Sequence, residues 1–133
     1  MLSVSHLSRC ITTLESSLAM YHAARNESVE QEVFRNAIVK GYELCQETIL
    51  KLLRDILQAH TNSSHRLEQL TIREQLQMAI SNNLMTPMEV ERWHIYHEKE
   101  CGIVDEIEIG ISDETLILLP QFIQDCHAFI KRL

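Results

Sequence analysis

The chain has 133 residues and a formal net charge of −7, and 45% of its residues are hydrophobic although only 5% are aromatic. This length suits one domain with a real core and is too short for two. With three glycines and two prolines, the composition favours helices over sheets. The negative charge excludes a protein that coats nucleic acid through bulk electrostatics, so any contact with RNA must be local or shared with a partner.

Two helices are predicted in the first half of the chain. Ser3 or Ser5 can cap a first helix that reaches about Ala24, because apolar residues recur there every three or four positions. A second helix over about 29–59 would span roughly 45 Å, the length of a whole bundle. Gly41 inside it indicates a close crossing with another helix. The residues expected on its main apolar face are Val33, Ala37, Gly41, Leu44, Cys45, Thr48, Leu52 and Ile56.

Two capping boxes mark the next helices. Residues 71–74 (TIRE) open a third helix, which ends at Asn82 and Asn83. Residues 86–89 (TPME) open a fourth helix with proline at its first position. In each box a threonine and a glutamate three residues later satisfy each other's backbone donors.

The last helix is expected to be capped by Asp113 and to carry inward-facing apolar residues as far as Ile130, with Pro120 kinking or restarting it. No repeat or linker divides the chain. The pattern therefore predicts an all-α fold, an antiparallel four- to five-helix up-and-down bundle, with residues 1–133 as a single domain.

The cysteines indicate the compartment. They form no CxxC pair and are widely spaced, at Cys10, Cys45, Cys101 and Cys126. We predict reduced, mostly buried thiols in a cytoplasmic protein. The sequence shows no signal-peptide pattern and no apolar run of about 18 residues, so no membrane contact is expected.

Arg92 and His97 are the two residues whose chemistry is most informative. A guanidinium can hold a phosphate through two hydrogen bonds, and an imidazole can move a proton near neutral pH. If the two converge, His97 would be the general base or acid on a ribose phosphodiester and Arg92 would stabilise the developing charge. Such a site needs no metal and would leave a 2′,3′-cyclic phosphate and a 5′-hydroxyl.

The spacing of this pair constrains where a site can form. Positions five apart on an ideal helix are rotated by about 140°, so Arg92 and His97 would not share a face. They can converge if the helix unwinds between them, or if each meets its counterpart across a two-fold axis. This favours a dimeric site near a helix end. Taken alone, the pair is also consistent with a surface arginine and a capping histidine.

Four further side chains are predicted to contact a substrate, namely Trp93, His94, Tyr96 and Glu43. Trp93 and Tyr96 can stack on a base, and packing in a core or an interface is their alternative role. Glu43 can face the site as an orienting carboxylate or pair with Lys40 on the helix surface.

A zinc site is the rival interpretation of the same stretch. His94, His97 and Cys101 have spacings that allow three ligands along one helix. No fourth ligand is evident, and neither HExxH nor CxxC occurs. We therefore predict neither a metal nor another cofactor.

The order of these segments is similar to that of a known family. The stretch 33–44 (VFRNAIVKGYEL), the Arg-x4-His spacing of Arg92 and His97, and the final helix with an internal proline carry the similarity. The chain resembles the HEPN superfamily, and more closely its branch of nucleotidyltransferase substrate-binding proteins. The resemblance covers nearly the whole chain.

The resemblance implies a helical bundle that forms a homodimer and is encoded beside a minimal nucleotidyltransferase. It implies either the endoribonuclease toxin of a toxin–antitoxin pair or a non-catalytic substrate-binding subunit of the nucleotidyltransferase. The family's catalytic residues correspond to Arg92 and His97. Trp93 stands where a small polar residue is common, and Lys99 where some members carry a tyrosine that the partner enzyme adenylates. Inactivation of the toxin by adenylation at that position is therefore not expected.

Overall fold

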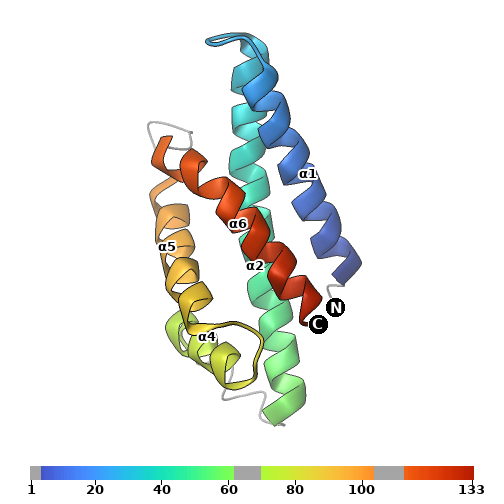
Figure 1. Ribbon diagram of the computed structural model, residues 1–133, viewed down its shortest axis with the longest axis vertical. Coiled ribbons are helices and arrows are strands. Elements are labelled where there is room, and N and C mark those ends of the chain that lie inside the picture. The colour runs from blue at the N-terminus through green and yellow to red at the C-terminus, as the bar shows by residue number, and fades with distance from the viewer. Residues whose placement is uncertain (1–3, 62–69, 104–112) are drawn as a thin grey trace.

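Five helices make up the computed structural model, which describes residues 4–61, 70–103 and 113–133 (Figure 1). They are α1 (Val4–Ala23), α2 (Val29–Thr61), α4 (Ile72–Ser81), α5 (Pro87–Ile103) and α6 (Asp113–Lys131). No strand occurs within these ranges, so the predicted all-α fold is confirmed. None of the helices described there is long and apolar enough to cross a membrane.

The long helices run alternately up and down. Figure 1 shows α1 and α2 as an antiparallel hairpin whose tip projects beyond the other helices. α6 crosses in front of α2, between α1 and α5, and the short α4 lies at the foot of the bundle. α5 and α6 therefore face the lower part of the hairpin, and the tip projects beyond the other helices that the structure describes.

The helix starts follow the predicted capping chemistry. Thr86 Oγ1 accepts from the Glu89 backbone N–H at 3.1 Å, and the Glu89 carboxylate accepts from the Thr86 N–H at 2.8 Å. Thr71 Oγ1 accepts from the Glu74 N–H at 3.2 Å, but here the Glu74 carboxylate accepts from the Thr71 hydroxyl at 3.1 Å and not from the backbone N–H that was predicted. Ser28 does the same for α2 by accepting from the Gln31 N–H, a cap that the sequence analysis did not identify. Capping thus fixes where three of the helices begin.

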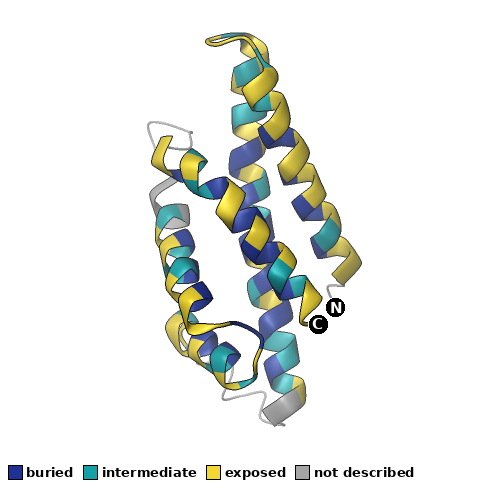
Figure 2. Ribbon diagram, viewed as in Figure 1, coloured by how far each residue is buried: buried dark blue, intermediate teal, exposed yellow. Residues whose placement is uncertain are grey.

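Each of the five described helices contributes buried residues to the core, and Figure 2 marks the buried positions on their ribbons in dark blue. Its largest fully buried side chains are Tyr42, Tyr96, Phe122, Phe129, Leu7, Ile11, Leu14, Ile38, Ile49, Leu53 and Leu57. The predicted apolar face of α2 is wrong at its beginning, because Val33 and Ala37 are exposed. Exposed Ala37 directly precedes fully buried Ile38, so Val33 and Ala37 lie on a side of α2 that the described helices leave uncovered.

The remaining sequence predictions have mixed outcomes. Pro120 lies inside a single continuous α6, so the helix does not restart there. Asp113 is the first residue of α6. Cys10, Cys45 and Cys126 are buried and free, as predicted, and burial raises the pKa of the Cys45 thiol to about 12. The side chain of Cys101 lies outside the described residues.

The close crossing predicted at Gly41 is present. A Cβ atom added to Gly41 would lie 3.2 Å from Leu14 Cδ1 and 3.5 Å from Leu14 Cβ. Because the nearer atom is the tip of a flexible side chain, a methyl group is accommodated by a small shift. Alanine also gains about 1 kcal/mol in helix propensity over glycine. We expect Gly41→Ala to change the free energy of unfolding by less than about 1 kcal/mol, and Gly41→Leu to lower it by about 2 kcal/mol through overpacking. Urea unfolding of both variants measures the difference, and equal losses would contradict a steric limit at Leu14.

Candidate functional site

Arg92 of α5 forms a two-pronged ion pair with Asp125 of α6. Its Nε donates to Asp125 Oδ2 and its Nη2 donates to Asp125 Oδ1, both at 2.8 Å. The side chain of Asp125 is only 3% exposed, whereas that of Arg92 is 31% exposed. The guanidinium therefore lies at the α6 edge of α5, anchored at one end to a carboxylate in the protein interior.

Two further donors complete the surroundings of Asp125. The Tyr96 hydroxyl donates to Oδ2 at 2.6 Å, and Gln121 Nε2 donates to Oδ1 at 3.2 Å. Burial opposes ionisation of Asp125, but the hydrogen bonds from Arg92 and Tyr96 outweigh it and lower the pKa of this carboxyl. The hydrogen bond to Asp125 raises the pKa of Arg92. The network therefore holds one carboxylate and one guanidinium in their charged forms.

Tyr96 also ties this network to α2. Its backbone carbonyl accepts from the Tyr42 hydroxyl at 2.8 Å and from Gln46 Nε2 at 2.9 Å. Burial, followed by the hydrogen bond to Asp125, raises the pKa of the Tyr96 phenol, which keeps it protonated as a donor. Tyr96 thereby connects α2, α5 and α6.

The aromatic residues near the pair belong to the core. Trp93 and Tyr96 are buried and pack edge to face, with ring centroids 5.3 Å apart. Phe122 contacts both of them and also Tyr42, at 4.7–5.5 Å between centroids. These positions correct the expectation that Trp93 and Tyr96 stack on a base, because neither ring offers a free face. Their role is to pack α5 against α2 and α6.

The histidines lie at the other edge of α5. His94 and His97 are both half-buried, one turn apart, and His94 is close to Arg73 of α4. Burial, and then the positive charge of Arg73 and the proximity of His97, lower the pKa of His94. This edge therefore faces α4, whereas Arg92 faces α6.

The structure does not bring Arg92 and His97 together within one chain. α5 is continuous from Pro87 to Ile103, so the helix does not unwind between them. The rotation of about 140° between the two positions is kept, and buried Trp93 and Tyr96 lie between the two edges. Of the two predicted routes to convergence, only the contact with a second copy is left.

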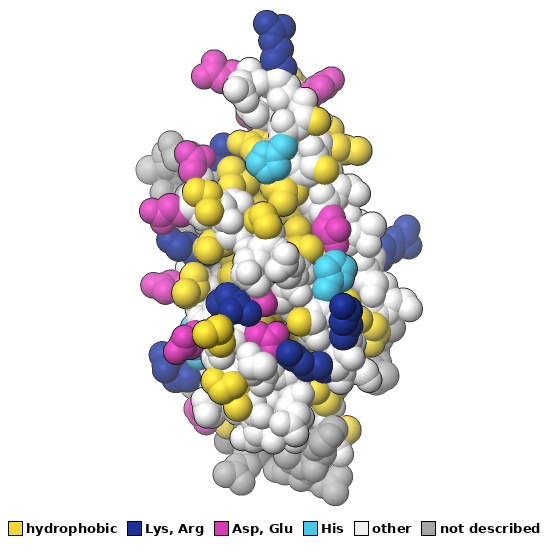
Figure 3. All heavy atoms as spheres, in the orientation of Figure 1, with side chains coloured by type: hydrophobic (Ala, Val, Ile, Leu, Met, Phe, Trp, Pro, Cys, Tyr) yellow, Lys and Arg dark blue, Asp and Glu magenta, His cyan; other side chains and the backbone are white. Residues whose placement is uncertain are grey.

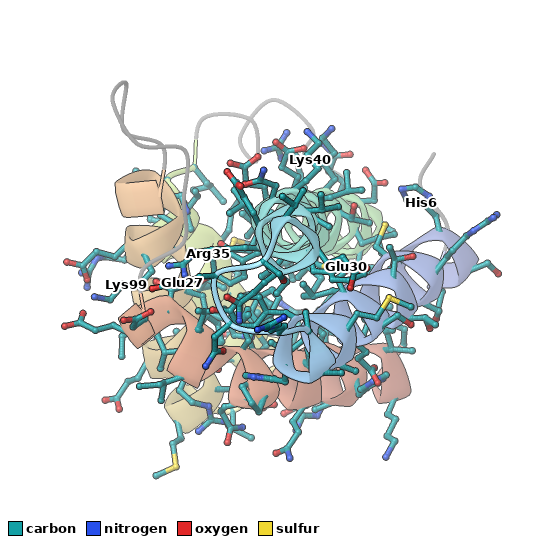
Figure 4. All side chains as sticks on the ribbon, turned by 90° about the horizontal axis from the view of Figure 1, so that it is seen from above. His6, Glu27, Glu30, Arg35, Lys40 and Lys99 are labelled. Atoms are coloured by element: carbon teal, nitrogen blue, oxygen red, sulfur yellow. The ribbon has the colours of Figure 1, made fainter. Side chains whose placement is uncertain are left out.

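Glu43 is half-buried on α2, directly after Tyr42. The neighbouring Lys40 is exposed and lies on the side of α2 away from the start of α6 (Figure 4). Arg35 and Lys99 lie toward that start, where they pair with Asp113 at 3.7 Å and Glu114 at 2.8 Å. These exposed pairs mark the position of α6, and Glu43 lies in none of the contacts around Asp125.

Asp125 and Gln121 are the site residues that sequence reasoning missed. Asp125 follows Phe122 by three positions and precedes Phe129 by four, so it lies on the apolar face of α6. A carboxylate on such a face needs a partner in the interior. The position of Asp125 on the apolar face of α6 therefore predicts a buried partner for its carboxylate. It does not indicate that this partner is Arg92.

Metal ligation is not supported by the described residues, in which no group of three or more His, Cys, Asp or Glu side chains is placed to hold an ion. The zinc alternative includes Cys101, whose side chain is outside that set. In the comparisons with known proteins, no family model, curated protein or solved structure matches this chain.

Proposed function

We propose that this chain is the HEPN-type partner of a minimal nucleotidyltransferase and the toxin of a toxin–antitoxin pair. In this proposal it is a metal-independent endoribonuclease that uses Arg92 and His97. The observation that supports it is the anchoring of Arg92 by buried Asp125. A buried ion pair is weak evidence for stability, because apolar replacements often do as well. Its occurrence on the motif arginine therefore favours a functional role for that cation.

The proposed site requires two copies of the chain. Arg92 and His97 lie on opposite edges of α5, and the outer face between those edges carries Met88 and Ile95, which are 68% and 44% exposed. A second copy packed on this face would cover both apolar side chains. It would also bring the Arg92 edge of one copy near the His97 edge of the other. His97 then moves the proton and Arg92 binds the phosphate.

The surface charge agrees with a local contact to RNA. In Figure 3, basic and acidic side chains are mixed on the lower half of the visible face, and hydrophobic side chains gather above them. With a net charge of −7, long-range attraction to RNA is weak. Binding would depend on the few cations at the shared site.

RNA cleavage in EDTA tests the proposal. We expect His97→Ala to lower the cleavage rate at least 100-fold, because general acid–base catalysis typically contributes 10²–10⁴-fold. His127→Ala is the matched control, since His127 pairs with Glu15 on the far side of α6. Mixing Arg92→Lys with His97→Ala protein should restore roughly a quarter of the wild-type rate, because half of randomly paired dimers contain one complete site of two. Equal cleavage by wild type and His97→Ala would reject the mechanism.

A non-catalytic subunit that binds or regulates the nucleotidyltransferase is the second candidate. The separation of Arg92 and His97 across α5, with Trp93 and Tyr96 buried between them, favours it. In that case the protein binds the neighbouring nucleotidyltransferase, and wild type and His97→Ala both leave RNA intact at every concentration. Co-purification together with the cleavage assay separates the two candidates.

A further inference from the structure

The Arg92 guanidinium has two pairs of N–H groups that can each bind an oxyanion, and only one pair is used. Asp125 accepts from the side pair, Nε and Nη2. The end pair, formed by Nη1 and the second N–H of Nη2, makes no hydrogen bond to any residue in 4–61, 70–103 or 113–133. Since the side chain is 31% exposed, this end can reach a ligand. Its geometry matches two oxygens of a phosphate group.

Asp125 holds the guanidinium rigidly because it is itself held from several sides. The Tyr96 hydroxyl and Gln121 Nε2 fix the two carboxylate oxygens. The Tyr96 backbone is fixed in turn by Tyr42 of α2. An arginine with a flexible side chain loses rotamer entropy when it binds an anion. The Arg92 side chain is already ordered in the folded protein, so this entropy loss does not weaken anion binding.

We propose that Asp125 is a positioning residue, which presents the end pair of Arg92 donors to a phosphate-type oxyanion. The inference deepens the proposed function and rests on it for the identity of the anion as an RNA phosphate. Asp125 touches no substrate in this scheme. It acts through Arg92, by fixing the direction of the guanidinium and keeping its remaining donors ordered.

The chain contains a matched control for this arrangement. Glu89 of α5 and Arg132, which directly follows the last residue of α6, form a second carboxylate–arginine pair. The Glu89 side chain is 7% exposed and that of Arg132 is 33% exposed, close to the values for Asp125 and Arg92. Glu89 also serves as the capping-box carboxylate of α5, so its role is structural. Asp125→Asn and Glu89→Gln therefore each neutralise a carboxylate of similar burial, but only Asp125 is predicted to support phosphate binding.

Binding of inorganic phosphate tests the inference without relying on cleavage. In ¹⁵N NMR spectra of the full chain, the Arg92 guanidinium signals should shift saturably as phosphate is added. Asp125→Asn should weaken that phosphate binding at least tenfold, and Glu89→Gln should leave it within twofold of wild type. In the cleavage assay, Asp125→Asn should lower kcat at least tenfold at a temperature where both variants remain folded.

The outcomes distinguish the inference from the proposed function. If phosphate does not shift the Arg92 signals of the wild type, or shifts them equally in wild type and Asp125→Asn, Asp125 is not a positioning residue. If Asp125→Asn and Glu89→Gln lose phosphate binding equally, Asp125 acts only through stability, which also overturns the inference. A wild type that binds phosphate through Arg92 yet never cuts RNA rejects the ribonuclease and supports the positioning role.

Discussion

Replacing Arg92 with methionine is expected to lower the free energy of unfolding by about 3 kcal/mol at pH 7, because removing one partner of a buried ion pair leaves the other charge unpaired. Asp125, at 3% exposure, cannot reach water to compensate. Breaking a buried ion pair in this way usually costs about 3–5 kcal/mol, and we expect the lower end of that range because Arg92 itself is partly exposed. The corresponding fall in Tm is roughly 10 °C for a chain of this length. Thermal unfolding followed by circular dichroism measures it.

The pH dependence of this loss has a definite sign. In the wild type the pKa of Asp125 is lowered, so its contribution to stability is complete above the unfolded value of about 3.9 and is lost as the pH falls through the folded value. Without Arg92, the largest remaining influence is burial, which raises the pKa of Asp125. The variant then loses stability as the pH rises above about 4, where the unfolded chain ionises freely. The stability difference between wild type and Arg92→Met should widen from pH 4 to pH 7.

Urea unfolding at pH 4, 5, 6 and 7 checks that sign. The double variant Arg92→Met/Asp125→Leu removes both charges, and it should recover most of the lost stability and show no widening. A constant difference between wild type and Arg92→Met across this pH range would mean that Asp125 does not carry the effect.

The helices were predictable because their signals are local in sequence. Thr86 and Glu89 are three residues apart, and their reciprocal hydrogen bonds need only the first turn of a helix. Gly41 likewise indicates a close crossing through its own lack of a side chain. The exposure of Val33 was not predictable, since it depends on which side of α2 the other helices cover.

The surroundings of Arg92 depend on contacts between distant parts of the chain. Asp125 is 33 positions away from Arg92 on another helix, and no spacing rule connects the two. Helical geometry correctly separates Arg92 from His97, and it also places Tyr96 on the Arg92 side, one turn later. Whether Tyr96 meets a base or a buried carboxylate is decided by the packing of α6. That packing is a property of the whole bundle, which the sequence pattern alone does not determine.

Truncating Phe122 to alanine should cause the largest single loss of stability, about 4 kcal/mol, because a fully buried phenyl ring is replaced by a cavity. The ring contacts Tyr42, Trp93 and Tyr96, so the cavity would open directly beside the network around Asp125. Phe34, half-buried near the hairpin tip, provides the control, and Phe34→Ala should cost about 1 kcal/mol.

Trp93, the only tryptophan in the chain, reports on the same cavity. Its fluorescence should shift to longer wavelength in Phe122→Ala and stay unchanged in Phe34→Ala, because only the first change admits water beside the indole. In the wild type, added RNA should leave the emission of buried Trp93 unaltered. Quenching by RNA would show that the indole stacks on a base after all. The aromatic cluster would then have to open during binding, and Trp93 would belong to the substrate site instead of the core.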